Sequence, residues 1–327
     1  MEFEILEDIT FLNKALVKVV GVGNGGCNAV QHMMRSGINV NGLCFICADT
    51  DAQTLGRRAG RKLQLGESLT KGAGTHGNPQ MGREAALESV AAIKDALCDA
   101  HMVFVVVCMG GDTGTGAAPI IAEIARELGA LTVGVATKSF HWEGEQRGKD
   151  AESSLAELKE YSDGLIHISN DRLLTFMPEN ATHAEMFKKA DDILYFAVKG
   201  IAELIADNSL VGFDFADLHS IMCNAGVMRM GMGIASGEKR AAEATRRALS
   251  DPLLEDVSVN KAKFVLYNIA AHPEVITGDE VVEIGNTIGD AVHPEGCVGM
   301  NLVYDEKIGA KLRVTLIVSE AAAELGA

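Results

Sequence analysis

The fold is decided by one stretch, Met102-Val103-Phe104-Val105-Val106-Val107-Cys108-Met109-Gly110-Gly111-Asp112-Thr113-Gly114-Thr115-Gly116, in which an apolar run passes directly into a glycine-rich loop. The apolar run is typical of a strand buried in a parallel sheet, and a helix is expected after the loop, over Ala117–Leu128. Glycines carry no Cβ, so successive backbone N–H groups can converge on phosphate oxygens, and a helix N-terminus adds positive potential. The loop therefore predicts a site for nucleotide phosphates, to which the hydroxyls of Thr113 and Thr115 add donors. The lysine of a Walker motif is absent, so the helix dipole, the backbone amides and Mg²⁺ must neutralise the phosphate charge.

Strand-like and helical stretches alternate on both sides of this loop. Strands are expected at Val17–Gly23, Gly42–Ala48, Met102–Cys108, Leu131–Ala136 and Gly164–Ile168. Helices are expected from near Gly26, at 82–98, at Ala117–Leu128 and at Asp150–Tyr161, whereas residues 59–80 are expected to form a loop. This alternation predicts an α/β fold with a doubly wound parallel sheet and right-handed crossovers.

The pattern changes towards the C-terminus. A helix expected at Ala190–Ala206 is apolar around most of its surface, which is typical of a helix packed between two domains. Beyond it, helices are expected at Asp214–Met222, Glu238–Leu249 and Asp279–Ala291, and strands at Lys263–Ala270, Val298–Tyr304 and Leu312–Ser319. We therefore predict a nucleotide-binding domain over residues 1–207, which includes the central helix at about 190–206, and a smaller α+β domain over residues 208–327.

The composition excludes several classes of function. Asp and Glu number 45 against 29 Lys and Arg, and the net charge of −16 argues against a partner such as nucleic acid or an anionic membrane. No apolar run approaches the ~20 residues that span a bilayer, and the acidic N-terminus is not a signal peptide. Cys44 and Cys47 lie three apart on an expected strand, so they face opposite ways and cannot share a metal ion. We expect buried free thiols and a cytoplasmic protein.

A second glycine motif follows the first expected strand. The stretch Gly21-Val22-Gly23-Asn24-Gly25-Gly26 satisfies the dinucleotide-binding fingerprint, and Asp49 ends the next strand, where an acid meets a ribose hydroxyl. Taken alone, this motif leaves open a dehydrogenase, or a tight strand–helix turn without a ligand. A dehydrogenase, however, has no need of the second loop at 110–116.

The two loops and several shorter motifs together resemble the FtsZ family, the bacterial homologues of tubulin, over essentially the whole chain. The tubulin signature GGGTGTG is present at Gly110–Gly116 with one change. The other matching stretches are Asp49-Thr50-Asp51-Ala52-Gln53, Gly74-Thr75-His76-Gly77-Asn78-Pro79, Asn170-Asp171-Arg172-Leu173-Leu174, Asp214-Phe215-Ala216-Asp217 and Ser250-Asp251-Pro252-Leu253-Leu254. The resemblance implies the tubulin/FtsZ fold and a GTPase that polymerises head to tail. It also implies that Mg²⁺ is held mainly by the phosphates of GTP and GDP, with no dedicated protein side chains.

The resemblance assigns roles to residues around the nucleotide. The residues of the first turn would lie against the phosphates and the sugar: Asn24, Gly25, Gly26, Cys27 and Asn28. Glu143 and Arg147, four apart on one helical face, match the family's ribose and phosphate contacts. Phe187 matches the aromatic residue that stacks on guanine. Asp191, helped by Asn170, matches the group that accepts hydrogen bonds from the guanine N1–H and N2–H₂ donors.

Two acids past the central helix complete the implied site. Asp214 and Asp217 lie three apart in the first turn of the next expected helix, where they can also cap it. In the family this loop enters the nucleotide site of the neighbouring subunit, and the acids orient or activate the attacking water. Hydrolysis then needs a head-to-tail filament of the chain with itself, because neither subunit holds a complete site.

The chain departs from the family pattern at several of these positions. Asp112 replaces a signature glycine and places a carboxylate beside a triphosphate, and Gly212 replaces an asparagine close to Asp214. Further departures are Asp49, Asn24, Cys27 and Ser139. They leave open an alternative with impaired hydrolysis, namely a nucleotide-binding paralogue that co-assembles with, or regulates, another FtsZ. The family's flexible linker and terminal tether peptide are also expected to be absent, because the last expected strand ends about eight residues before Ala327.

Overall fold

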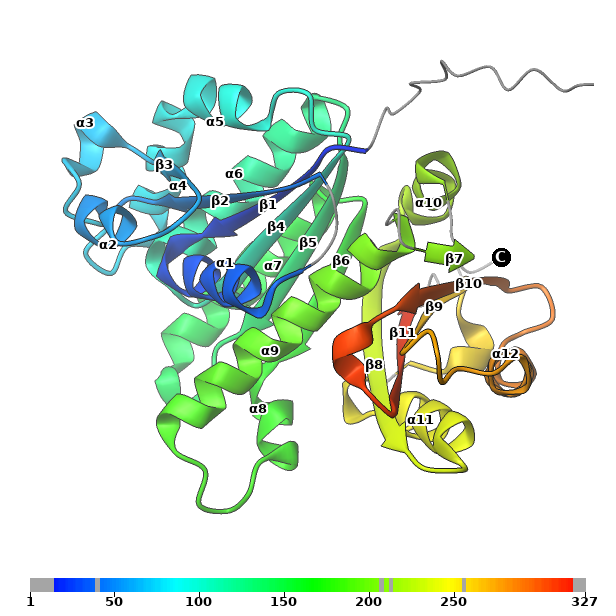
Figure 1. Ribbon diagram of the computed structural model, residues 1–327. Helices are drawn as coiled ribbons and strands as arrows, with labels where there is room; N and C mark the ends of the chain where they lie inside the picture. Colours follow the sequence, from blue (N-terminus) through cyan, green and yellow to red (C-terminus); the bar gives the residue numbers. More distant parts are fainter. Residues whose placement is uncertain (1–14, 39–41, 206–208, 212–213, 255–256, 320–327) are drawn as a thin grey trace, which may run out of the picture.

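The computed structural model describes residues 15–38, 42–205, 209–211, 214–254 and 257–319 (Figure 1). The described strands form a single mixed sheet in the order β3-β2-β1-β4-β5-β6-β8-β11-β9-β10-β7. We call the segment from β3 to β6 the parallel half and the segment from β8 to β7 the mixed half. The two halves correspond to the two predicted kinds of architecture, whereas the predicted boundary at residue 207 stays a prediction.

The parallel half contains the five predicted strands and one further strand, β3, at its edge. In sheet order its strands are β3 (Arg61–Gln64), β2 (Leu43–Asp49), β1 (Val17–Val22), β4 (Met102–Met109), β5 (Leu131–Lys138) and β6 (Gly164–Ser169). Every pairing among them is parallel. Alternate residues of β4 enter two cores on opposite faces, as Phe104 and Val105 illustrate. The doubly wound parallel sheet is therefore confirmed.

Helices cover both faces of the parallel half. One face carries α1 (Gly23–Ser36) and α9 (His183–Ala202). The other face carries α4 (Pro79–Glu88), α5 (Val90–Leu97), α6 (Asp112–Glu127) and α7 (Glu145–Glu160). Three short helices lie in connections: α2 (Ala52–Gly56), α3 (Glu67–Thr70) and α8 (Asn170–Leu173).

The mixed half has its own core. Its strands are β8 (Gly226–Ser236), β11 (Lys311–Ser319), β9 (Phe264–Ala271), β10 (Cys297–Tyr304) and β7 (Ser209–Val211). Only β9 and β10 pair in parallel, and the other pairs are antiparallel. Helices α11 (Arg240–Leu249) and α12 (Gly278–Ala291) contribute Ala244, Ile284 and Ile288 to this core. Helix α10 (Phe215–Met222) instead packs Leu218 and Met222 into the core that contains α9.

The central helix connects the two halves. It starts at His183, seven residues before the predicted start, with a capping box in which Thr182 accepts from the Glu185 backbone. As predicted, most of its apolar residues are buried, including Ile193, Leu194 and Ile201. Just past its end, the buried carboxylate of Glu203 accepts from Asn268 on β9 at 2.5 Å and from Arg313 on β11 at 3.4 Å. These bonds fix the C-terminal end of α9 to the mixed half.

Several local features of the fold differ from the predictions. The expected loop at 59–80 contains β3 and α3, and the single helix expected at 82–98 is interrupted at Ser89. The thiols are free, but Cys44, Cys98 and Cys297 are exposed rather than buried. Strand β8 was missed because it is rich in glycine and methionine and poor in β-branched residues. Its glycines allow α11 to approach: a Cβ on Gly233 would lie 1.9 Å from the Ala244 carbonyl oxygen.

Candidate functional site

The two glycine turns meet at the carboxyl edge of the parallel half. The turn after β1 opens α1 and the turn after β4 opens α6, and β1 and β4 are neighbours in the sheet. A Cβ on Gly23 would lie 2.8 Å from the backbone nitrogen of Gly114, and one on Gly26 would lie 2.3 Å from the Val106 carbonyl oxygen. Glycine is therefore required here because backbone segments pack directly on one another. Ligands of open α/β sheets bind at this edge.

Helix α6 begins at Asp112, not at Ala117 as predicted, so most of the glycine loop forms its first turn. Gly110 has a φ of 98°, which favours glycine, and Gly111 is the extended N-cap residue. Within the described chain no side chain caps this helix. Its first backbone N–H groups therefore point out of the helix end without a capping side chain, the arrangement that holds phosphate oxygens.

The two threonines of the loop are engaged inside the protein. Both are buried, and the Oγ1 atoms of Thr113 and Thr50 are 2.7 Å apart. The Thr115 Oγ1 accepts a hydrogen bond from the Gly110 backbone nitrogen at 2.9 Å. These bonds fix the shape of the loop. A further role of the hydroxyls as donors to phosphate stays a prediction.

The first turn explains two departures from the family pattern. Asn24 is exposed, and its Oδ1 accepts a hydrogen bond from Arg58 at 2.6 Å. Cys27 is buried, and its thiol donates to the Gly21 carbonyl oxygen at 3.3 Å. The neighbouring Cys47 thiol and, after it, burial raise the pKa of Cys27 well above its usual value. Both side chains therefore fit the turn, while Gly25 and Gly26 keep the positions at which Cβ atoms would clash. Asn28 is exposed on the same helix.

Sequence reasoning missed Arg58, which places a cation beside this turn. Its guanidinium lies close enough to favour the charged forms of Asp49 and Asp191 as well as to bind Asn24. Asp49 itself is buried and accepts from the backbone nitrogen of Thr50. It is therefore held by its own chain. No sequence signal singles out Arg58 among the 29 Lys and Arg residues.

Aromatic side chains gather where the base is expected. Phe187 is 39% exposed at the start of α9, and its ring lies 5.7 Å from that of the buried Phe140 in an edge-to-face arrangement. The Trp142 ring stacks on that of Phe140, with the ring centroids 4.1 Å apart. An exposed ring held by other rings is a suitable surface for stacking a purine.

Two polar side chains predicted to recognise guanine, Asn170 and Asp191, lie in surroundings that leave their oxygen atoms poorly satisfied. The Oδ1 of Asn170 is buried and has no hydrogen-bond partner among the described residues. Burial raises the pKa of Asp191 to about 6, with Asp192 acting in the same direction and His32 and Arg58 opposing it. Both groups are therefore acceptors that a donor-bearing ligand would satisfy.

Glu143 and Arg147 come together, but not on one helical face as predicted. Gly144, with a φ of 116°, separates the short turn at His141–Glu143 from α7. The Arg147 guanidinium nevertheless donates to Glu143 at 2.9 Å. The half-buried Cys108 thiol lies at the end of β4. Desolvation raises its pKa to about 11, and the charges of Asp191 and Glu143 act in the same direction, so both acids lie on the side of this strand end.

The remaining pair of predicted residues lies elsewhere. Asp214 caps α10 by accepting from the Asp217 backbone nitrogen at 2.7 Å, as predicted, and both side chains are exposed. The Phe215 ring lies 5.9 Å from His101, which precedes β4, so α10 sits at the amino edge of the parallel half. Figure 1 shows α10 at the end of α9 opposite α8. A strand of this length spans roughly 25 Å, so these acids cannot reach the glycine loops of their own chain. Gly212 lies outside the described residues.

Among the described residues, no group of three or more His, Cys, Asp or Glu side chains is placed to hold a metal ion. None of the described helices has the length and apolar character needed to cross a bilayer.

Comparisons with known proteins agree with this geometry. Residues 16–178 match the model of the Tubulin/FtsZ family GTPase domain, and residues 226–322 match the FtsZ family C-terminal domain. The cell division protein FtsZ of Pseudomonas aeruginosa is 44% identical over 324 residues, which cover 99% of this chain and 81% of the relative. That of Coxiella burnetii is 43% identical, covering 99% and 83%. An empty FtsZ dimer from M. jannaschii superposes with a TM-score of 0.88 at 39% identity, covering 94% of this chain and 88% of the other.

Proposed function

This chain belongs to the tubulin/FtsZ family, and we propose that it hydrolyses GTP where two copies of it meet head to tail in a filament. Membership of the family makes it a GTP-binding, polymerising GTPase of cell division. The observation that carries the finer proposal is the placement of the two half-sites at opposite edges of the parallel half. One molecule offers nucleotide at one edge and two exposed acids at the other. Stacking copies in one direction brings these edges together and continues without closing.

The residues divide the reaction between the two molecules. One molecule stacks guanine on Phe187, reads its donors with Asp191 and Asn170, and holds the phosphates on the N-terminus of α6. Asp214 or Asp217 of the next molecule positions a water molecule and accepts its proton while the water oxygen bonds to the γ-phosphorus. The bond from that phosphorus to the β,γ-bridging oxygen breaks, and GDP and inorganic phosphate are released. Such a transfer depends mainly on positioning and charge stabilisation.

We include Mg²⁺ in the proposal. Asp112 is the one carboxylate of the glycine loop, it is half-buried in the first turn of α6, and carboxylate oxygen is the kind of ligand that Mg²⁺ prefers. Bound there with the phosphates, the ion would neutralise their charge and that of Asp112. With Mg²⁺ bound in this way, the carboxylate of Asp112 would be compatible with a bound triphosphate.

The proposal also names a location and a partner. We place the protein in the cytoplasm, with its principal partner a second copy of itself. The alternative of a regulatory paralogue rests on Asp112 and on Gly212, and only the first lies in the described chain. Identity of 44% to a cell-division FtsZ over 324 residues does not favour that alternative, and the two FtsZ-type domains leave no ground for a dehydrogenase.

A mixing experiment tests the shared site. Asp214→Asn keeps the nucleotide half and loses the acid, whereas Asp191→Ala weakens the nucleotide half and keeps the acids. Each variant alone is expected to release little phosphate from GTP. An equimolar mixture recovers activity, because an intact nucleotide site then faces an intact pair of acids. Exclusive hydrolysis within single molecules predicts no recovery on mixing.

Protein concentration supplies an independent measurement. Phosphate release per molecule should rise steeply as the wild-type concentration increases and then level off once filaments have formed. Pelleting or electron microscopy with GTP and with GDP should show filaments over the same range. Constant activity per molecule from well below to well above that range would contradict the shared site.

A further inference from the structure

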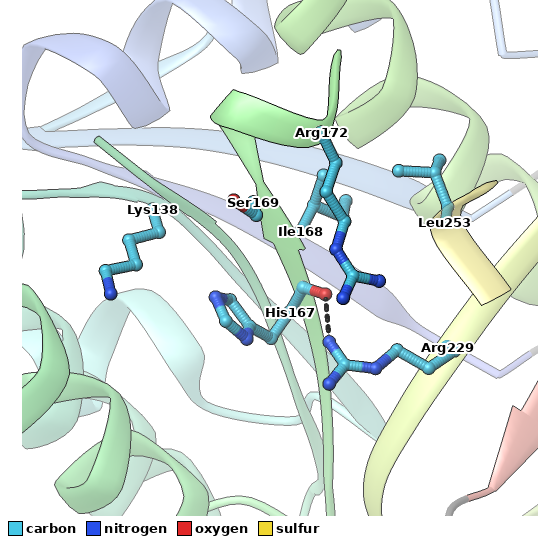
Figure 2. A pocket seen from close by; sticks show the side chains of 7 residues that line it. All are labelled: Lys138, His167, Ile168, Ser169, Arg172, Arg229 and Leu253. Carbon is cyan, nitrogen blue, oxygen red and sulfur yellow. Dashed lines mark hydrogen bonds between the residues drawn. The ribbon is translucent and has the colours of Figure 1, made fainter. Parts of the chain in front are cut away.

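A pocket that the proposed function does not use lies where the two halves of the sheet join. Strands β6 and β8 pair over only three residues each, Gly164–Ile166 with Gly226–Met228. Beyond this point they diverge, and the side chain of Arg229 crosses the gap to donate to the His167 carbonyl oxygen at 2.9 Å. The space left beside this bond is a cavity of about 300 Å³ (Figure 2).

The lining of this pocket is basic in a strongly acidic protein. The residues that line it are Lys138, His167, Ile168, Ser169, Arg172, Arg229 and Leu253, and none of these seven is acidic. Figure 2 shows the guanidinium groups of Arg172 and Arg229 extending toward the same space, with the imidazole of His167 between them and Lys138. Both arginines also make other contacts within the chain. Outside the lining, Glu152 pairs with Lys138 at 2.5 Å.

The pKa of His167 reflects the burial and the positive charge of the pocket. Burial and, after it, the charges of Arg229, Lys138 and Arg172 together lower the pKa of its imidazole to about 4. Its Nε2 is buried and has no hydrogen-bond partner among the described residues. A buried polar atom of this kind is normally satisfied by protein, water or a ligand. The side chains therefore present cations and an unsatisfied ring nitrogen to one cavity.

The size and chemistry of the pocket select its ligand. A volume of about 300 Å³ is at the lower end of small-molecule sites, which admits a phosphate group with a short organic portion. Arginine pairs are the groups that proteins use for bidentate recognition of phosphate and carboxylate oxygens. The lining comes from both halves, because Lys138, His167 and Arg172 belong to the parallel half while Arg229 and Leu253 belong to the mixed half.

We propose that this pocket is a regulatory site for a small phosphate-bearing anion, which Lys138, Arg172 and Arg229 bind together with His167 across the joint between the two halves. The bound anion neutralises side chains contributed by both halves and so stabilises their relative arrangement. None of these four residues is among those proposed to bind GTP.

Calorimetry tests the proposal on the full chain saturated with GDP and Mg²⁺, at constant ionic strength in chloride buffer. The probes are inorganic phosphate and glycerol 3-phosphate. Saturable binding at one site per chain is expected, weakened roughly tenfold or more by Lys138→Met and by Arg172→Gln. The matched control is Lys94→Met, because Lys94 is a surface lysine paired with Glu127 away from the pocket, and it should leave binding unchanged. Tighter binding of glycerol 3-phosphate would identify a phosphorylated metabolite, and tighter binding of phosphate would identify the free ion.

Two results would overturn the proposal. One is the absence of saturable binding. The other is binding that Lys138→Met and Arg172→Gln leave unchanged, since phosphate would then occupy the γ-phosphate position beside GDP. If the variants do not fold, the wild-type chain still gives an answer through the ring resonances of His167. Bound anion is expected to raise its titration midpoint by about one unit or more, and an unmoved midpoint at saturating probe contradicts the assignment.

Discussion

The two ends of α9 hold the two halves of the proposed site, and they are built in different ways. At the N-terminal end, glycine turns pack backbone against backbone, and buried side chains such as Thr113 and Asn170 complete the arrangement. At the other end, Asp214 and Asp217 are exposed, and only Asp214 has a structural task as the cap of α10. Packing within one chain fixes the shape of the site at the N-terminal end. At the C-terminal end, the carboxylates are exposed to solvent and are available to a neighbouring molecule. Changes at the first end should therefore disturb folding, and changes at the second should disturb function alone.

The largest expected effect follows from removing one acid. Asp217→Asn should lower the rate of GTP hydrolysis by roughly 1,000-fold, the scale on which a positioned acid or base contributes to catalysis. Asparagine has the same shape and Asp217 has no capping role, so the free energy of unfolding should change by no more than about 1 kcal/mol, the scale of an acid in the first turn of a helix. Phosphate release and urea denaturation measure the two quantities.

A matched control exists in α12. Asp279 is also an exposed acid in the first turn of a helix, so Asp279→Asn should have the same small effect on stability and none on GTP hydrolysis. If Asp217→Asn loses clearly more stability than Asp279→Asn, the two ends of α9 are not different in the way argued above.

The next effect belongs to the packed end. Gly26→Ala places a Cβ 2.3 Å from the Val106 carbonyl oxygen, so the backbone must shift. We expect a loss of about 3 kcal/mol in the free energy of unfolding, at the upper end for overpacking. Urea denaturation of the nucleotide-free chain measures it.

Gly289→Ala provides the control for this substitution. Gly289 lies in α12, and no heavy atom would lie within 4 Å of its Cβ. Alanine there should leave stability unchanged or raise it by up to ~1 kcal/mol, because alanine restricts the unfolded chain. Equal effects at both positions would show that packing does not set the glycine requirement.

The difference between the two ends also explains how much the sequence could predict. The strand at 102–109 and its glycine loop were predictable because an apolar run and a phosphate-binding motif are adjacent in the chain. The true start of α6 was not, since Gly114 and Gly116 have poor helix propensity and are helical only because other backbone packs on them. Strand β8 was not predicted for a similar reason: its glycines have poor strand propensity and are accommodated there because the backbone of α11 packs on them. Arg58 has no motif, and only the folded chain brings it to Asn24.

The resemblance to a family supplied the acids. Nothing in the spacing of Asp214 and Asp217 distinguishes a catalytic pair from a helix cap, and the folded chain confirms the cap. What the structure adds is their separation from the glycine loops, which a single sequence does not encode. The proposal of a shared site therefore depends on both the family resemblance and the structure.

A smaller effect concerns pH at the base-binding end. Burial raises the pKa of Asp191 to about 6 in the nucleotide-free chain, so its neutral form stabilises the fold at low pH and this contribution is lost as pH rises through 6. In the proposed site guanine binds the carboxylate form of Asp191, so the affinity for GDP should fall as pH drops below 6, by roughly tenfold at pH 5. Titration of GDP binding from pH 5 to 8 measures this change. Asp191→Asn should bind more weakly at pH 7 and show no such fall. A wild-type profile parallel to that of the variant would contradict the role of Asp191.

The smallest expected effect is that of a substitution at Asp112, which shares features with both ends of α9. It belongs to the packed glycine loop, but its carboxylate, like those of Asp214 and Asp217, is not needed for packing. It is the acid of the first turn of α6. Near a helix N-terminus such an acid contributes about 0.3–1 kcal/mol, so Asp112→Asn should lower the free energy of unfolding by no more than that.

The substitution Asp112→Asn should also strengthen GTP binding a few-fold in the absence of Mg²⁺, because one repulsive charge is removed, and strengthen GDP binding less. With Mg²⁺ the difference should shrink, since the cation lies between the charges. Fluorescence of Trp142, the single tryptophan, provides the binding signal beside Phe140. Equal affinities for the wild type and Asp112→Asn without Mg²⁺ would mean that this carboxylate faces away from the phosphates, and its replacement of a signature glycine would then carry no penalty for the nucleotide.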